Sequence, residues 1–209
     1  MKLALLFFGI HYLERYIHWT HWSVSIDFKQ YFDNYKEHLF DYLEKQYKEI
    51  DTYISSYHSE KEKLLLSIYH PTRYKFSNIR NGVDHTIQRN QRFLELIDLP
   101  QKEYDFYLIT RFDLDFVGNF DMLKIDDNKI NIPHKTGNFK DKDIIEDNFY
   151  IISAKCFDKF KNICKSIPLY ESFHKLHYYN KELEINYMID GFFYSFESPF
   201  YRFRRNFVR

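Results

Sequence analysis

Tyr104–Phe116 reads Tyr-Asp-Phe-Tyr-Leu-Ile-Thr-Arg-Phe-Asp-Leu-Asp-Phe, and this stretch decides the fold. Phe106–Thr110 is a short apolar run of β-favouring residues, which is typical of a central strand covered on both faces. Side chains alternate along a strand, so a strand continuing through the motif would place Asp113 and Asp115 on one face and Leu114 on the other. Two adjacent carboxylates repel each other unless a positive group lies between them.

A divalent cation would remove this repulsion. Magnesium and manganese sites commonly use one or two protein carboxylates and complete their octahedron with phosphate oxygens and water. Ligand sites of open α/β sheets lie beyond the carboxyl ends of the strands, which is where Asp113 and Asp115 fall. We therefore expect Mn²⁺ or Mg²⁺ at these two residues, together with a nucleoside diphosphate. The alternative is a solvated turn. Arg111 shares the parity of the acids, and it would either contact a phosphate or pair with one of them.

The length and composition of the chain predict one soluble domain. The chain has 209 residues, enough for a sizeable core, and we expect a single domain over residues 1–209. The 30 basic and 30 acidic side chains cancel, which argues against a general nucleic-acid-binding protein. Leu3–Ile10 is too short and poorly flanked for a signal peptide, and no apolar run is long enough to form a transmembrane segment. The sequence therefore predicts a cytoplasmic protein.

The two cysteines support the same compartment. Cys156 and Cys164 fall on one predicted helix, about 12 Å apart along its axis. That separation is too large for a disulfide. Unpaired cysteines are typical of a reducing compartment.

The rest of the chain reads as alternating strands and helices. The predicted strands are Lys2–Gly9, Asp51–Tyr57, Tyr74–Ile79 at an edge, Phe106–Thr110, Lys129–Pro133 and Asn148–Ile152. The predicted helices are Asp27–Ile50, Lys61–Ile68, Asp84–Leu99, Ser153–Pro168 and Phe173–Tyr179, the first, third and fourth beginning at a capping residue. This alternation predicts an α/β fold with a mainly parallel, twisted central sheet and helices on both faces.

Several segments allow more than one interpretation. His11–Trp22 is expected to be a loop, and the polar segment Thr136–Asp147 is expected to be a mobile one. Residues 171–209 are poorly assigned: Ile185–Phe196 suits a helix or a strand. The arginine-rich tail Tyr201–Arg209 is either a solvated basic end or a flap over an anionic ligand.

Four segments in a fixed order carry a resemblance. They are Leu-Leu-Phe-Phe-Gly at 5–9, Tyr-Ile-Ser-Ser-Tyr at 53–57, the stretch at 104–116 and Glu-Asp-Asn-Phe-Tyr-Ile-Ile-Ser-Ala-Lys at 146–155. Together they resemble small GT-A-fold glycosyltransferases, including single-domain ones of large DNA viruses and bacterial surface-polysaccharide clusters. Arg-Phe-Asp-Leu-Asp-Phe is the most specific part, and the last forty residues or so match no family that we can name.

The resemblance implies an enzyme that moves a sugar from a nucleoside-diphosphate sugar, with a UDP-sugar as the expected donor, to a hydroxyl of a glycan or glycoprotein. Asp113 and Asp115 would hold manganese or magnesium on the diphosphate. Similar enzymes often supply a further metal ligand from near the C-terminus, and three residues are candidates here: His174, His177 and Asp190. The nucleoside would lie against the ends of the first two strands, at Gly9, Ile10, His11, Ser56 and Tyr57.

The diphosphate would also need cationic side chains, because one divalent ion does not cancel its charge and that of two aspartates. Arg111, the helical pair Arg89 and Arg92, and the C-terminal arginines are candidates, since a guanidinium can donate two bonds to one phosphate. The structural alternative for Arg89 and Arg92 is a solvated helix surface. By the resemblance, the segment Glu146–Ser153 would border the donor sugar and the acceptor.

The reaction type leaves the catalytic base open. An inverting enzyme needs a carboxylate to take the proton of the acceptor hydroxyl, and Asp147 or Glu146 could do so. A retaining enzyme needs no such base. Two other functions also stay open. A haloacid-dehalogenase-like phosphotransferase uses Asp-x-Asp too, but normally on the first strand and followed by Thr. The other is a non-catalytic relative that binds nucleotide sugars or carbohydrates.

Overall fold

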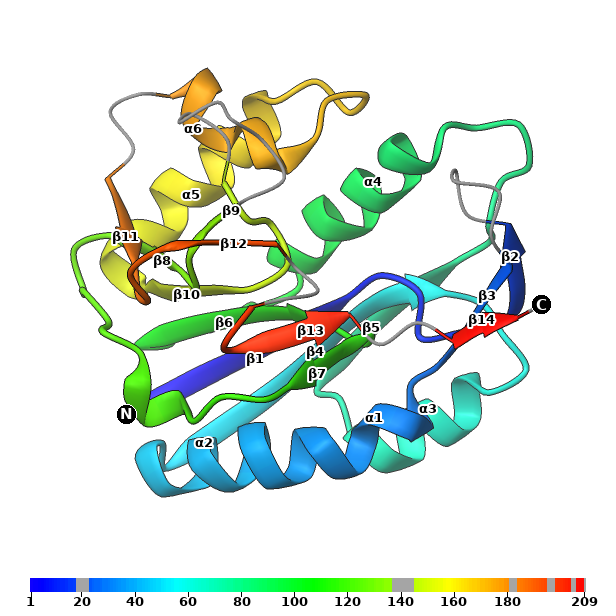
Figure 1. Ribbon diagram of the computed structural model, residues 1–209, viewed down its shortest axis with the longest axis horizontal. Coiled ribbons are helices and arrows are strands. Elements are labelled where there is room, and N and C mark those ends of the chain that lie inside the picture. The colour runs from blue at the N-terminus through cyan, green and yellow to red at the C-terminus, as the bar shows by residue number, and fades with distance from the viewer. Residues whose placement is uncertain (18–22, 137–144, 181–183, 195–197, 204–205, 209) are drawn as a thin grey trace.

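A seven-stranded sheet forms the centre of the computed structural model (Figure 1). The structure describes residues 1–17, 23–136, 145–180, 184–194, 198–203 and 206–208. The strands of the sheet are β1 (Lys2–Phe8), β4 (Glu49–Tyr57), β5 (Arg73–Ser77), β6 (Phe106–Arg111), β8 (Ile130–Ile132), β10 (Tyr150–Ser153) and β11 (Ile185–Tyr187).

The sheet is mainly parallel, as predicted. β1 pairs in parallel with β4 on one side and with β6 on the other. β5 and β11 form the two edges, each parallel to its neighbour. β10 runs antiparallel to both β6 and β8. The spatial order is β11-β8-β10-β6-β1-β4-β5, so the α/β class and the predicted edge strand, now β5, are confirmed.

Helices cover both faces of this sheet. In Figure 1, α4 and α5 lie on one face, and α1, α2 and α3 lie on the other. The helical segments are α1 (Lys29–Asn34), the π-helical η1 (Tyr35–Phe40), α2 (Asp41–Gln46), α3 (Glu62–Tyr69), α4 (His85–Ile97), the 3-10 turns η2 (Phe120–Met122) and η3 (Phe173–Lys175), α5 (Ala154–Ser166) and α6 (Leu176–Tyr179).

Alternation along β1 builds two cores. The odd-numbered side chains from Leu3 to Phe7 belong to the core under α1, α2 and α3. The even-numbered side chains from Ala4 to Phe8 belong to the core under α4 and α5. The strand is therefore apolar on both faces, which is what its uninterrupted hydrophobic sequence predicts. Both cysteines lie on α5 as free thiols, as expected from their spacing.

Three small sheets complete the described fold. β2 (Tyr12–Ile17), β3 (Ser23–Asp27) and β14 (Asn206–Val208) form one, so the loop predicted at 11–22 is wrong where the structure describes it; residues 18–22 lie outside. β9 (Lys135–Thr136) pairs with β12 (Phe192–Phe193), which makes part of the ambiguous segment 185–196 a strand. β7 (Leu114–Phe116) pairs with β13 (Tyr201–Phe203).

This last pairing corrects the interpretation of the motif strand. β6 ends at Arg111, and after a break β7 leaves the central sheet to pair with β13. The prediction of one strand running through both aspartates is therefore wrong. The partner strand lies more than eighty residues along the chain, and no local pattern reports it. The tail from Tyr201 is correspondingly neither a solvated end nor a detached flap over its first three residues.

Two further predictions needed correction. The helix expected over Asp27–Ile50 starts at Lys29, is π-helical in its middle and ends at Gln46, because β4 begins earlier than its apolar pattern indicates. Ser153 stands at the N-cap position of α5, but its hydroxyl donates to the carbonyl of Asp127 instead of capping the helix.

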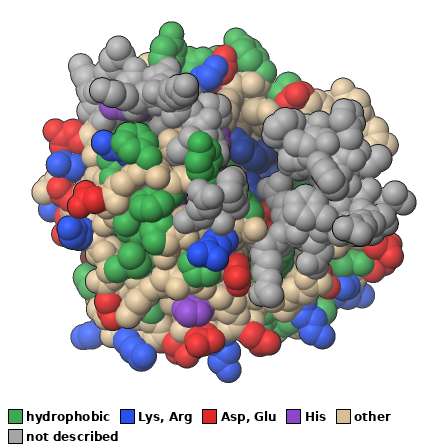
Figure 2. Space-filling model, in the orientation of Figure 1, with side chains coloured by type: hydrophobic (Ala, Val, Ile, Leu, Met, Phe, Trp, Pro, Cys, Tyr) green, Lys and Arg blue, Asp and Glu red, His purple; other side chains and the backbone are tan. Residues whose placement is uncertain are grey.

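The predicted mobile loop at 136–147 falls largely outside the described residues. Its two described ends are buried: Thr136 at one end, and Ile145 to Asp147 at the other. No helix in the described ranges is long and apolar enough to span a membrane. Acidic and basic side chains are interspersed along the lower edge of the face in Figure 2, the side of α1 and α2, which agrees with the balanced composition.

Helix α4, which carries Arg89 and Arg92, begins at the predicted cap. Asp84 accepts hydrogen bonds from the backbone N–H of Thr86 at 2.7 Å and of Ile87 at 3.4 Å. We expect Asp84→Ala to lower the free energy of unfolding by about 1 kcal/mol, because these N–H groups lose their acceptor. Urea unfolding measures the change.

Asp84→Asn is the matched control, because asparagine caps helices about as well as aspartate. The N–H groups lower the pKa of Asp84 in the folded protein. The extra stability that Asp84 gives relative to asparagine should therefore be present above the carboxyl pKa of the unfolded chain, and it should be lost as the pH falls through the carboxyl pKa of the folded protein. An alanine variant as stable as the parent protein at neutral pH would contradict the capping role.

Candidate functional site

The candidate site lies where the chain leaves the parallel strands at their carboxyl ends. Phe8 of β1 pairs with Ser55 of β4 and with Arg111 of β6, so these three ends are adjacent. β10 runs the opposite way, and its start at Tyr150 pairs with Ile109 of β6. The segment that precedes β10 therefore reaches the same edge of the sheet.

Arg111 is joined to Asp113 by a bidentate ion pair. Its Nε and Nη2 donate to the two carboxylate oxygens at 2.7 and 2.8 Å. Asp113 is 1% exposed. Burial by itself would lower the pKa of Arg111, but the carboxylate of Asp113 holds it above its ordinary value. The guanidinium also lies 5.1 Å from the ring centroid of Phe203 and 5.9 Å from that of Phe8. Of the two roles that the sequence allowed for Arg111, this structure shows the pair with an acid.

Asp115 lies in the middle of β7, and this short strand is held along both edges. Residues of β13 pair with it on one side, where exposed Arg202 stands opposite Asp115. On the other side the side-chain amide of Asn34 accepts from the N–H of Phe116 and donates to its carbonyl, both at 2.8 Å. Asp115 is half-buried. The side chains of the other tail arginines lie outside the described part.

A second ion pair joins α4 to the segment before β10. Arg89 Nη2 donates to Asp147 Oδ2 at 2.8 Å and lies 3.3 Å from Ser172 Oγ. His174 Nε2 is 3.3 Å from Asp147 Oδ1, and its Nδ1 is 2.5 Å from the carbonyl of Ile145. Because a carbonyl only accepts, Nδ1 carries a proton. Asp147 Oδ1 is buried and has no hydrogen-bond partner among the described residues.

The charge state of Asp147 follows from these neighbours. Burial would raise its pKa, but Arg89, His174 and Arg111 together hold the pKa of Asp147 below its ordinary value. Asp147 is therefore ionised at neutral pH. The adjacent Glu146 is completely buried, and it accepts from the side-chain amide of Asn148 and from the N–H of Asp147 at 3.2 Å.

One group of side chains in the described ranges has the geometry of a cation site. Glu146, Asp147 and His174 each offer a ligand atom, and these atoms lie within 4.8 Å of one another. Of the three C-terminal candidates, His174 is thus the one beside carboxylates of the site. Asp190 is exposed and forms a 3.7 Å ion pair with Lys124.

The loop after β1 is tied to the end of β4 by a buried chain of hydrogen bonds. Ser56 Oγ donates to the carbonyl of Gly9 at 2.6 Å, so it must accept from His11 Nδ1, 2.7 Å away. His11 Nε2 then accepts from Ser59 Oγ at 2.7 Å. Burial lowers the pKa of His11 to about 4, against the opposing charge of Asp27, so the ring is neutral at pH 7.

The five residues expected around a nucleoside fall into two groups in the structure. Gly9, His11 and Ser56 are brought together, but they are buried in the network. Gly9 has φ of 99°, a backbone conformation that favours glycine. Ile10 and Tyr57 instead line a cavity of about 390 Å³, whose wall is completed by Leu13, Ile79, Asn81, His85 and Gln88. Burial raises the pKa of Tyr57 to about 12, so its hydroxyl is a neutral donor at pH 7.

Three supporting residues have no local pattern that would indicate their role. Asn34 contacts β7, Tyr35 Oη donates to the carbonyl of Arg111, and Asn148 Oδ1 lies 3.5 Å from Arg111 Nη1. Asn34 and Tyr35 act across 82 and 76 residues of chain. Of the three, only Asn148 lies in a segment with a predicted role, Glu-Asp-Asn, and that role was predicted for the two acids.

No protein-family model matches the chain, and no curated protein matches it. A similar solved structure is a point mutant of Drosophila beta-1,4-galactosyltransferase 7, a GT-A-type enzyme, in complex with manganese, UDP-Gal and xylobiose. The TM-score is 0.51 at 8% identity, over 99% of this chain and 72% of that chain. The chain has a GT-A-like fold.

A second similar structure is the inositol-1-phosphate CTP transferase of T. maritima, with a TM-score of 0.48 at 8% identity, over 90% of this chain and 86% of that one.

The Arg89–Asp147 pair yields a prediction about stability. Arg89→Ala leaves the Asp147 carboxylate buried without its guanidinium, so we expect the free energy of unfolding to fall by about 3–5 kcal/mol. The double variant Arg89→Ala/Asp147→Asn should lose less than the single one, because no charge then remains buried. A double-mutant cycle by urea unfolding measures the coupling.

The pH dependence has a defined sign. Because the folded pKa of Asp147 is lowered, its stabilisation is present above the unfolded carboxyl pKa and is lost as the pH falls through the folded value. Arg89→Ala should move this loss to higher pH. Arg73→Ala, which removes an exposed arginine of β5, is the control. Additive effects in the cycle would show that the pair does not couple.

Proposed function

We propose that the protein is a metal-dependent glycosyltransferase that moves a sugar from a nucleoside-diphosphate sugar to a hydroxyl of a glycan. One observation carries the proposal: the Arg111–Asp113 and Arg89–Asp147 ion pairs lie close together at the carboxyl edge of a GT-A-like sheet, near a cavity lined by Tyr57. The donor and acceptor bound in the galactosyltransferase neighbour, UDP-Gal and xylobiose, are of these two classes. UDP-sugars are therefore the first donors to test.

The cavity next to Tyr57 suits the nucleoside. Ile10 and Tyr57 offer an apolar and an aromatic wall, while Asn81 carries an amide that both donates and accepts hydrogen bonds. The buried network of Gly9, His11 and Ser56 would hold this wall in place without contacting the base. The diphosphate would then extend towards Arg111 and Arg89, whose positive charge would stabilise a leaving diphosphate.

Asp113 and Asp115 are not equally suited to bind a divalent cation. Both oxygens of Asp113 accept from Arg111, so Asp113 would have to share or give up one of these bonds to bind an ion. Asp115 is half-buried at the same edge. We therefore assign the metal to Asp115, completed by phosphate oxygens and water, and give Asp113 the role of fixing Arg111. When bound, the ion would neutralise charge on the departing nucleoside diphosphate.

Asp147 is the better of the two proposed bases. Its Oδ1 accepts no hydrogen bond among the described residues and lies 3.3 Å from His174 Nε2, while Arg89 holds the other oxygen. The carboxylate is ionised at neutral pH, so Oδ1 could take the proton of an acceptor hydroxyl in an inverting reaction. Glu146 already accepts two hydrogen bonds and is completely buried. The positive charge of Arg89 beside Asp147 also favours a base over a second metal site there.

The phosphotransferase alternative is disfavoured by the same geometry. Its nucleophile would be Asp113, and that carboxylate is engaged at both oxygens by Arg111 on a break after β6, not at the end of the first strand. The non-catalytic relative predicts binding without turnover, so the experiments below separate it from the enzyme.

The first experiment concerns the metal. We expect a UDP-sugar to bind more tightly with Mn²⁺ than with EDTA, and Asp115→Asn to lose most of that difference, because a ligand to the ion is removed. Isothermal titration calorimetry measures both affinities. Asp121→Asn is the matched control, an exposed aspartate six positions away. Equal affinity for the UDP-sugar with and without metal in the parent protein would refute the assignment of the metal to Asp115.

The second experiment concerns turnover. We expect Asp147→Asn to lower the rate of nucleoside diphosphate release in the presence of acceptor by at least about 100-fold, the usual scale of general-base catalysis. Donor affinity should stay within a factor of about three, since Asp147 is proposed to act on the acceptor. A variant with unchanged turnover excludes Asp147 as the base. A parent protein that binds donor but never turns it over is the non-catalytic relative.

A further inference from the structure

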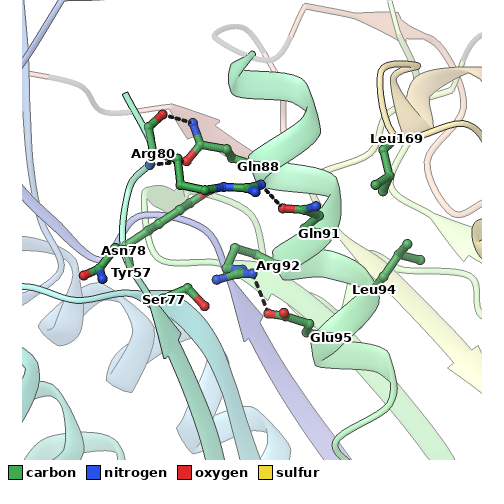
Figure 3. Close-up of a pocket in the computed structure, with 10 residues that line it drawn as sticks. All are labelled: Tyr57, Ser77, Asn78, Arg80, Gln88, Gln91, Arg92, Leu94, Glu95 and Leu169. Carbon is green, nitrogen blue, oxygen red and sulfur yellow. Dashed lines mark hydrogen bonds and ion pairs between the residues drawn. The ribbon is translucent and has the colours of Figure 1, made fainter. Parts of the chain in front are cut away.

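A second cavity, of about 570 Å³, lies beside α4 and the end of β5 (Figure 3). It shares Tyr57 and Gln88 with the cavity assigned above to the nucleoside. The rest of its wall is distinct and mostly polar, and it includes Ser77, Asn78 and Arg92. The proposed reaction gives this cavity no role.

Arg92 is the unusual residue of this cavity. Its side chain is 8% exposed, and its Nε–H has no hydrogen-bond partner within the part of the chain that the structure describes. Figure 3 shows the guanidinium directed from α4 towards Ser77. Its carbon lies 5.8 Å from the ring centroid of Tyr57, within the range of a cation–π contact. Buried donors without an acceptor are rare in native proteins, and this one belongs to a guanidinium whose residue lines the cavity.

The charge of the cavity favours an anion. Arg80 and Arg92 are opposed by Glu95 alone among its lining residues, which leaves a net positive charge. Glu95 pairs with Arg92 Nη2 at 2.8 Å, but it also pairs with Lys75 at 2.8 Å, so its negative charge is shared. The pairing with Glu95 therefore does not neutralise the site.

The wall of the cavity is also preorganised. The side chain of Gln88 accepts from the N–H of Arg80 at 2.7 Å and donates to its carbonyl at 3.0 Å. It donates to the carbonyl of Val83 at 3.0 Å as well. These bonds tie the segment after β5 to α4, while Arg80 Nη2 donates to the side chain of Gln91. Arg80 and Arg92 are thus held on the same wall without the loop having to order on binding.

We propose that this cavity is an oxyanion site, which binds a phosphate or carboxylate group of a small molecule through the guanidinium of Arg92. A guanidinium suits both groups because its N–H donors are coplanar and charge-assisted. The side chains of Ser77 and Asn78 can donate further hydrogen bonds to the same group. The site does not depend on the proposed glycosyl transfer, and its test needs no sugar donor.

The direct test follows the Arg92 Nε–H resonance by ¹H–¹⁵N NMR of the full chain, assigned by its absence in Arg92→Lys. Titration with inorganic phosphate, and separately with acetate, distinguishes the two sources of the oxyanion. We expect a saturable shift of this resonance with at least one of them, whereas the exposed Arg73 Nε–H should not move. An Arg92 resonance that moves with neither anion overturns the proposal, whatever the variants do.

A variant series separates this site from the donor site. Arg92→Gln should weaken binding of the active anion about tenfold or more, equivalent to about 1.4 kcal/mol, and abolish the rise in thermal midpoint that the anion gives the parent protein. Arg73→Gln makes the same change of charge outside the cavity and should leave both unchanged. If instead Arg111→Gln removes the binding and Arg92→Gln retains it, the anion binds at the proposed diphosphate site and the second site is refuted.

Discussion

The buried carboxylates at the edge of the sheet are the constraint on which the rest of the site depends. Asp113, Glu146 and Asp147 are all at most 3% exposed, and an ionised carboxylate is costly to bury unless cations and hydrogen bonds compensate it. Arg111 and Arg89 supply the cations, from β6 and from α4. The Arg89–Asp147 pair thereby fixes the segment before β10 against α4, and the Arg111–Asp113 pair fixes the turn after β6. An arrangement held in this way is rigid before any ligand arrives, which is what electrostatic stabilisation of a leaving group requires.

Aromatic side chains form the frame around these charges. Arg111 lies near the rings of Phe8 and Phe203, which come from the first strand and the tail. Phe116 contacts rings from η1, from η2 and from the residues just before β10 and β13: Tyr35, Phe120, Phe149 and Phe200. The tail is therefore part of the site's structure. β7 is short and lies outside the central sheet, so it depends on the tail strand that pairs with it and on packing by aromatic side chains, which make up 21% of the chain.

Contacts between near neighbours could be predicted from the sequence, and distant ones could not. The apolar alternation of β1, the Asp84 cap of α4 and the edge position of β5 follow from local patterns, and the structure has all three. The β7–β13 and β3–β14 pairings depend on partners near the C-terminus, so the sequence indicated neither. The same limit applies within the site. A pattern placed Gly9, His11 and Ser56 at one sheet edge, but it could not show that they bond to one another and are buried.

Helix α4 connects the acidic site and the second cavity. Arg89 and Arg92 are three residues apart, so at about 100° per residue they project in directions only about 60° apart. That small angle separates a guanidinium paired with Asp147 from one directed into the cavity beside Tyr57. Both positions are set by the same buried face of the helix, where Phe93, Leu96 and Ile97 pack on the sheet. A shift or rotation of α4 would therefore change the surroundings of both arginines together. If a ligand at one of the two sites binds one position of α4 more tightly than another, its binding would change the ligand affinity of the other site.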